Sequence, residues 1–168
     1  MKPKLRLLLT EKCSRRCKGC CNKDWDLNIL PVCESFDGYK EVLITGGEPM
    51  LYVDRIIDVW MKCKITDSNI KVYMYTAYIS HPNLLNILCF LDGMTITIHT
   101  KKDIKNFIIL DNYLSILKIP DKSMRLRVFK GIKLPQLKYK NWKIKKDLVW
   151  EKNCPLPDGE EFKKYERV

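Results

Sequence analysis

Short apolar runs recur along the chain and predict strands. Leu5–Thr10 is almost wholly apolar, and Ile70–Thr76 is rich in β-branched and aromatic residues, as buried strands are. Met124–Phe129 instead alternates apolar and basic residues, which is the pattern of a half-buried strand. Six segments are predicted as strands, the last one short: Leu5–Thr10, Glu41–Thr45, Ile70–Thr76, Met94–His99, Met124–Phe129 and Leu148–Trp150.

Three segments between these strands have helical spacing. The apolar residues of Tyr52–Lys64 fall on one helix face, and His81–Leu91 has Pro82 near its start, where a helix accepts proline. Asp103–Leu117 is the third predicted helix. Strands and helices that alternate in this way predict an α/β fold of right-handed βαβ units with a mostly parallel sheet.

The length limits the architecture. Five or six βα units fit in 168 residues, whereas eight units of about 30 residues each would not. We therefore expect a partial (β/α)5-6 barrel in a single domain over residues 1–168, with its core over residues 4–130. The stretch from Cys20 to Gly38 has room only for a short helix, and residues 131–168 are expected to form an irregular basic segment.

Composition excludes several classes of protein. Eight prolines and seven glycines are ordinary, so collagen and a disordered chain are excluded. No apolar run approaches the roughly 18 residues of a membrane span, and the N-terminus lacks the apolar stretch of a signal peptide. We expect a cytoplasmic protein without a membrane partner.

The charge is strongly positive and unevenly distributed. The chain carries a formal charge of +11, and residues 121–168 hold 14 basic and 7 acidic side chains. Such a segment suits a protein partner, a phosphorylated or acidic substrate, or nucleic acid. A solvated, lysine-rich surface is the alternative interpretation, since no arginine-rich run or nucleic-acid motif accompanies it.

Eight cysteines are many for such a chain, and four of them, Cys13, Cys17, Cys20 and Cys21, lie within nine residues. Without a secretion signal, the triplet Cys13, Cys17 and Cys20 points to a metal or cluster rather than to disulfides. Structural zinc would need a fourth ligand, for which Cys21, Cys33 or Cys154 would have to serve. Three thiolates on a [4Fe–4S] cluster would leave one iron open to a ligand. Two other cysteines, Cys63 and Cys89, lie among apolar residues of predicted helices and are expected to be core thiols.

The C-x3-C-x2-C spacing after the first predicted strand resembles the radical S-adenosylmethionine (radical SAM) superfamily. The lead-in Leu8-Leu9-Thr10-Glu11-Lys12 is typical of that family, and so is Thr45-Gly46-Gly47-Glu48-Pro49 after the second predicted strand. Two glycines let a ligand approach the backbone closely, and Glu48 supplies an acceptor. The resemblance covers Leu5 to about Phe129.

The resemblance implies an enzyme with a [4Fe–4S] cluster and S-adenosylmethionine (SAM) as cofactors. Cys13, Cys17 and Cys20 would bind three irons, and SAM would chelate the fourth. An electron from a donor of the flavodoxin or ferredoxin type would cleave SAM to a 5′-deoxyadenosyl radical, which takes a hydrogen atom from substrate. The expected cofactor-binding residues are the Gly-Gly-Glu-Pro segment and polar residues at strand ends: Gly46, Gly47, Glu48, Pro49, Thr76, His99 and Arg127.

The segment that carries the triplet, residues 11–22, is called the cluster loop below; it resembles that of the activating enzymes of anaerobic ribonucleotide reductase. Lys18-Gly19-Cys20-Cys21-Asn22 and the nearby Trp25 carry this likeness, which implies a glycyl radical enzyme as partner. Cys21 stands where those enzymes have an aromatic residue, and their Gly-Pro-Gly-x-Arg segment does not precede the triplet. Three alternatives stay open: a compact small-molecule enzyme similar to 7-carboxy-7-deazaguanine synthase, a peptide-modifying enzyme, and a redox or scaffold protein.

Overall fold

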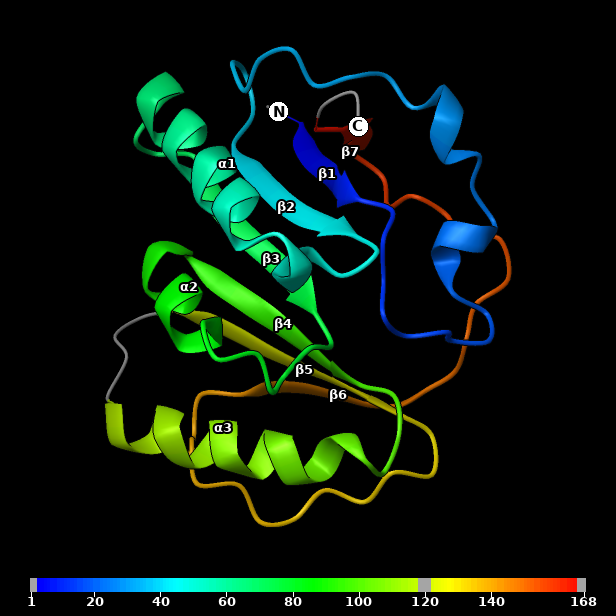
Figure 1. Ribbon diagram of the computed structural model, residues 1–168, viewed down its shortest axis with the longest axis vertical. Helices are drawn as coiled ribbons and strands as arrows, with labels where there is room; N and C mark the ends of the chain where they lie inside the picture. The colour runs from blue at the N-terminus through cyan, green and yellow to red at the C-terminus, as the bar shows by residue number, and fades with distance from the viewer. Residues whose placement is uncertain (1–2, 118–121, 166–168) are drawn as a thin grey trace.

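The computed structural model describes residues 3–117 and 122–165, and its centre is one open sheet of seven parallel strands. The spatial order is β6-β5-β4-β3-β2-β1-β7 (Figure 1). The strands are β1 Lys4–Thr10, β2 Glu41–Gly46, β3 Lys71–Thr76, β4 Gly93–Ile98, β5 Ser123–Phe129, β6 Lys143–Leu148 and β7 Glu160–Lys164. The expected α/β class and parallel sheet are therefore confirmed.

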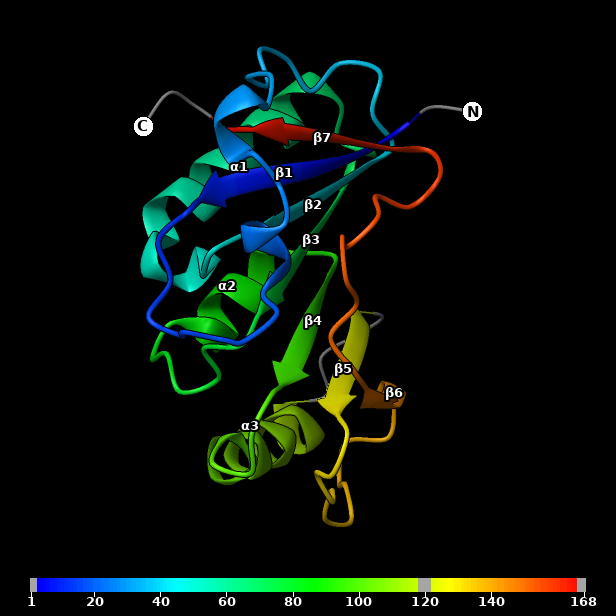
Figure 2. The ribbon, with the colours of Figure 1, turned by 90° about the vertical axis from the view of Figure 1, so that its right-hand side faces the viewer.

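Three α-helices pack on one face of this sheet: α1 Val53–Thr66, α2 Leu84–Phe90 and α3 Asp103–Leu117. Figures 1 and 2 show them on the same side, and the strand direction turns markedly from β1 to β5. No α-helix of the described residues covers the opposite, inner face. On the inner side, the ends of the strands are therefore covered by loops and not by α-helices.

The core lies between the sheet and the helices. Alternate strand residues point into it, as Val72 and Met74 of β3 do, and both are fully buried. Ile56, Val59 and Cys63 form the buried stripe of α1. Each buried side chain of this size stabilises the fold by about 1.5–3 kcal/mol. Phe107 is the largest fully buried side chain and fixes α3 to the sheet.

The chain after residue 130 is more regular than expected. It contributes β6 and β7, and the predicted strand Leu148–Trp150 is wrong except for its first residue. Both strands lie at sheet edges and carry few apolar residues, so they lack the hydrophobic pattern of an internal strand. β7 pairs with β1 across the whole chain length, which local pattern does not reveal.

Other boundaries shift as well. The helix predicted from His81 begins at Leu84, and the first connection holds two 3-10 turns, Cys21–Lys23 and Leu27–Ile29, in place of a short helix. Cys63 is a core thiol as expected, but Cys89 is exposed because it lies on the outer face of α2. No helix of residues 3–117 and 122–165 is long and apolar enough to cross a membrane.

Candidate functional site

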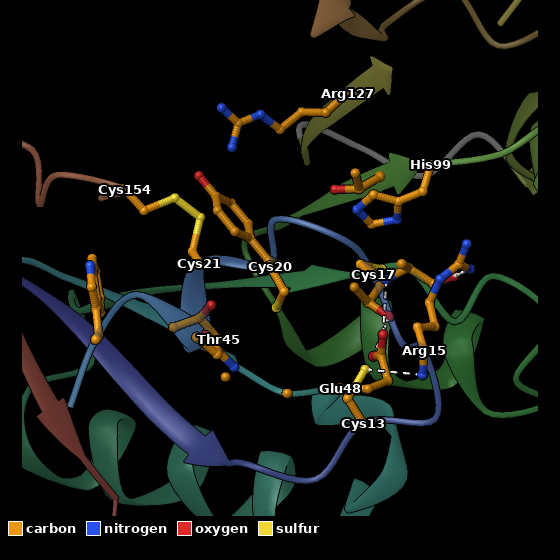
Figure 3. A pocket seen from close by; sticks show the side chains of 18 of the residues that line it. Cys13, Arg15, Cys17, Cys20, Cys21, Thr45, Glu48, His99, Arg127 and Cys154 are labelled. Carbon is orange, nitrogen blue, oxygen red and sulfur yellow. Dashed lines mark hydrogen bonds between the residues drawn. A yellow bond between two sulfur atoms is a disulfide. The ribbon is translucent and has the colours of Figure 1, made fainter. Parts of the chain in front are cut away.

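A pocket of about 210 Å³ lies at the carboxyl ends of the strands, where parallel sheets place their ligands. It gathers the expected residues from four strands, β2 to β5, and from the cluster loop: Cys13, Cys17, Cys20, Gly46, Gly47, Glu48, Thr76, His99 and Arg127. Figure 3 shows most of these side chains around one space. Pro49 does not line it; it is buried as the first residue of the 3-10 turn Pro49–Leu51.

Arg15 fixes the cluster loop to the sheet. Its guanidinium donates two parallel hydrogen bonds to the Asp103 carboxylate, at 2.9 and 2.8 Å, and a third to the Ala77 carbonyl at 3.1 Å. Asp103 also accepts from the backbone N–H groups of His99 and Thr100, at 3.0 and 2.9 Å. One buried carboxylate thus joins the cluster loop, the end of β4 and the start of α3.

The electrostatics of this pair favour its charged form. Burial alone would raise the pKa of Asp103, but the hydrogen bonds from Arg15 and from the Thr100 and His99 N–H groups lower it overall. The hydrogen bond to Asp103 raises the pKa of Arg15 above its ordinary value. This contact was not predicted from the sequence, because an arginine between two cysteines does not indicate which residue it will pair with.

The Gly-Gly-Glu segment holds the cluster loop from the other side. The Gly47 N–H donates to the Thr10 carbonyl at 2.6 Å, and the Glu48 N–H donates to the Lys12 carbonyl at 2.9 Å. A Cβ atom on Gly47 would lie 2.1 Å from the Lys12 oxygen, and one on Gly46 would lie 2.4 Å from the Thr10 oxygen. The expected close approach to these glycines is therefore made by the chain itself. Any contact with a ligand is additional.

Glu48 is buried, with 2% of its surface exposed, and both carboxylate oxygens are hydrogen-bonded. Oε1 accepts from the Thr76 hydroxyl at 2.6 Å and from the Met50 N–H at 3.2 Å. Among the described residues, Oε2 accepts a hydrogen bond from the Ala77 N–H alone, at 3.0 Å. Since each carboxylate oxygen can accept two hydrogen bonds, Oε2 retains capacity for one more donor. Thr76 therefore lines the pocket and also holds the Glu48 carboxylate in place.

The three thiols reach the pocket from one loop. The pKa of Cys13 is raised, first by burial and then by the Glu48 carboxylate and the thiols of Cys17 and Cys20, while the Arg15 N–H opposes the rise. The Cys13 thiolate is disfavoured first by burial and then by its negative neighbours. A positively charged metal centre would offset that repulsion, because metal coordination favours the deprotonated thiol.

No three His, Cys, Asp or Glu side chains of residues 3–117 and 122–165 are arranged to hold a single metal ion. Three thiolates on one zinc would lie within about 4 Å of each other, since each Zn–S bond is about 2.3 Å. The fourth ligands considered for zinc are also engaged elsewhere: Cys21 is bonded to Cys154, and Cys33 is buried away from the pocket. A [4Fe–4S] cluster places each thiolate on a different iron, so its ligands surround a larger group.

His99 lines the pocket as a neutral imidazole. Burial, followed by the charge of Arg15, lowers its pKa to about 4, while Asp103 opposes the shift. Its ring stacks on Trp150 with a centroid distance of 5.2 Å and contacts Phe129 at 4.9 Å. Its buried Nδ1 has no hydrogen-bond partner within the described part of the chain. Buried polar atoms usually have a partner, so this Nδ1 is an exception among the described residues.

The C-terminal segment covers part of the pocket, which the sequence did not predict. Trp150 packs on Gly19, whose φ of +71° and missing Cβ make room for the indole. Cys154 forms a disulfide with Cys21. The metal or cluster was expected on Cys13, Cys17 and Cys20, and these two cysteines were considered only as fourth ligands for zinc. The Trp25 indole N–H donates to the Asn153 carbonyl at 3.4 Å. The sequence features that could have indicated this contact are Trp150 and Cys154, a tryptophan and a cysteine in an otherwise polar tail.

Comparison with known proteins adds no family assignment. No protein-family model matches the chain, and no curated protein matches its sequence. The resemblance described above therefore depends on the motifs and on the pocket that they share.

Proposed function

We propose that the chain is a radical SAM enzyme that abstracts a hydrogen atom from a substrate. The observation that carries this proposal is the convergence of two sequence motifs on one pocket. The cysteine triplet follows β1 and the Gly-Gly-Glu segment follows β2, and both line the same space with His99 and Arg127. The open parallel sheet is compatible with the partial barrel of that family.

Each group has a role in this proposal. Cys13, Cys17 and Cys20 would hold three irons of a [4Fe–4S] cluster. With SAM bound, the cluster would supply the electron that releases a 5′-deoxyadenosyl radical. Glu48 has a free acceptor position at Oε2 for an amino group, and the Arg127 guanidinium suits a carboxylate.

His99 and Trp150 would act on the side of the pocket away from β2. The neutral imidazole lines the pocket, its Nδ1 is buried without a partner among the described residues, and the Trp150 indole covers one face of the ring. Arg15 and Gly47 hold the cluster loop in place from two sides. This positioning role requires no contact with the reacting atoms. The net charge of +11 favours association with an acidic electron donor of the flavodoxin or ferredoxin type.

Two substrate classes fit this proposal. A glycyl radical enzyme is suggested by Gly19, Asn22 and Trp25, which resemble ribonucleotide reductase activases. Two of these residues also have local structural roles, since Gly19 accommodates Trp150 and Trp25 packs against Phe162 with a centroid distance of 4.4 Å. A small-molecule substrate is the second class, and the inner face of the sheet favours it, as argued below.

The test is anaerobic reconstitution with iron and sulfide, followed by iron and sulfide analysis and an absorbance spectrum. The wild type should bind a thiolate-ligated iron–sulfur centre, and each of Cys13→Ala, Cys17→Ala and Cys20→Ala should lose it. Cys89→Ala, an exposed thiol on α2, is the matched control and should retain the full content. Cys21→Ala should also retain it. Loss in the Cys89 control equal to that in the triplet variants would contradict the assignment, as would tight zinc binding in place of iron.

A further inference from the structure

Four cations stand together on the inner face of the sheet. Arg125 of β5 pairs in register with Lys143 of β6, and Arg127 pairs with Lys145. Register partners on parallel strands project to the same face, about 4.8 Å apart, and alternate residues along a strand lie about 6.6 Å apart. We call these four residues the basic block. Its side chains emerge from a patch of backbone of roughly 5 by 7 Å.

The basic block lacks compensating acid. Within the described residues, none of its four side chains forms an ion pair, and Asp147, the nearest acid along β6, makes none with them. Other cations of the inner face are paired: Arg6 with Glu160 at 2.8 Å and Lys4 with Glu41 at 3.0 Å. Like charges opposite one another destabilise a sheet. An anionic ligand would relieve that repulsion.

Aromatic rings lie beside the basic block on the same face. The Arg127 guanidinium stands over the Tyr75 ring at 5.8 Å from its centroid. Tyr73, Tyr75 and Arg125 line a second hollow, and Tyr75 and Thr45–Gly47 with Arg127 line the pocket of the cysteine triplet. Tyr75 is therefore shared by both hollows, so a planar group on its ring would lie between the cations and the triplet. Figure 3 shows Arg127 projecting over the same space as the labelled cysteines.

The extent of the basic block indicates a small anion. On β4, the neighbours in register with Arg125 and Arg127 are Thr95 and Thr97, which carry no charge. The next cations across the face, Lys4 and Arg6, are already paired. A nucleic acid strand or an extended acidic peptide needs a longer track of free cations. A short chain of phosphates matches four cations in a compact group.

We propose that the basic block binds the phosphates of a nucleoside triphosphate, with its base against Tyr75. Arg125, Lys143 and Lys145 hold the phosphates, and Arg127, whose guanidinium has five N–H donors, is shared with the carboxylate named above. That the nucleoside triphosphate is the substrate of hydrogen abstraction rests on the proposed function above. That it binds to the basic block does not depend on that function. Charge-assisted hydrogen bonds to the phosphates supply affinity, and ring stacking with the guanidinium and phenol planes supplies selectivity for a base.

The test is a binding titration of the full chain by calorimetry at low and moderate salt. The probes are the four ribonucleoside triphosphates, inorganic tripolyphosphate, adenosine, a ten-residue glutamate peptide and a single-stranded oligonucleotide. At least one triphosphate should bind, tripolyphosphate should bind more weakly, and adenosine should not saturate. Binding should weaken as salt screens the basic block.

Variants assign the binding to the basic block. Arg125→Gln with Lys145→Gln should weaken triphosphate binding by about tenfold or more, because two charge-assisted contacts to the phosphates are lost. Lys143→Gln with Lys145→Gln is a second variant in case the first folds poorly. The control is Lys133→Gln with Lys138→Gln, which removes the same charge from the exposed loop that packs along α3 through Asp111. It should bind within about twofold of the wild type.

Four results would overturn the proposal: no triphosphate binding, equal weakening in the control, tighter binding of the peptide or oligonucleotide than of any triphosphate, or tripolyphosphate binding as tightly as the best triphosphate. The titration is run on both the isolated and the iron-reconstituted protein. If triphosphates bind while no cluster forms, the proposed function fails and this inference stands. If a cluster forms and no triphosphate binds, the inference fails and the proposed function stands.

Discussion

Asp103→Asn and Arg15→Gln, combined in a double-mutant cycle, test whether one ion pair fixes the cluster loop to the sheet. The two side chains are 11% and 24% exposed, and the pair has the two-point geometry in which arginine binds carboxylates most strongly. Charge-assisted hydrogen bonds of this kind contribute about 1.5–3 kcal/mol. We therefore expect a coupling free energy of about 1.5–3 kcal/mol, because both partners are mostly shielded from water.

Each single variant should destabilise the fold by at least this coupling. Asp103→Asn should also weaken the start of α3, because the carboxylate accepts from the N–H groups of His99 and Thr100, and a lost cap costs about 1 kcal/mol. The free energy of unfolding is measured by urea titration for the wild type, both single variants and the double variant.

The pH dependence of stability is an independent check on the contribution of Asp103, and its direction follows from the lowered pKa. The pKa of Asp103 is lowered in the fold, so its contribution is fully present above the unfolded value of about 3.9. The contribution should be lost as the pH falls through the lower folded pKa. The stability difference between the wild type and Asp103→Asn should therefore shrink in acid and stay constant from pH 6 to 8, within the range above about 3.9.

The control is the exposed pair of Lys4 and Glu41, whose side chains are 53% and 35% exposed. Lys4→Gln and Glu41→Gln should show a coupling of about 0.2–1 kcal/mol, as surface pairs do. A coupling for Arg15 and Asp103 no larger than in this control would refute the inference that the pair anchors the loop.

Two further predictions concern the close contacts around the pocket. Gly47→Val should disrupt the cluster loop and lower iron binding as well as SAM affinity, because its Cβ would lie 2.1 Å from the Lys12 oxygen; normal iron content with reduced SAM affinity alone would restore the simpler ligand role. Trp150→Ala should lower the free energy of unfolding by about 1–2 kcal/mol, since it removes ring contacts with both His99 and Phe129. An unchanged urea midpoint for Trp150→Ala would show that the C-terminal segment does not pack on the pocket in solution.

The internal strands could be predicted from the sequence because their side chains are buried and their apolar pattern is therefore strong. Val72 and Met74, for example, mark β3 without any structural information. β7 could not be found in this way, since Glu160–Lys164 contains one apolar residue and takes its place from pairing with β1. The edge strand β6 was similarly concealed by its exposed, mostly charged side chains.

The candidate site was predictable where chemistry depends on local spacing. The cysteine triplet and the two glycines are recognisable within a few residues, although the partner of the glycines turned out to be the cluster loop. Arg15 and Asp103 lie 88 positions apart, and Gly19 and Trp150 are separated still more widely. Contacts of this kind depend on the folded arrangement, so no local pattern reports them.

The most direct test of the central claim is the formation of 5′-deoxyadenosine. The protein is reconstituted anaerobically with iron and sulfide, mixed with SAM and dithionite, and its products are quantified by chromatography and mass spectrometry. The wild type and Cys89→Ala should cleave SAM reductively to methionine and 5′-deoxyadenosine, and Cys17→Ala should not. Intact SAM in the wild-type reaction, with the cluster present and reduced, would contradict the account.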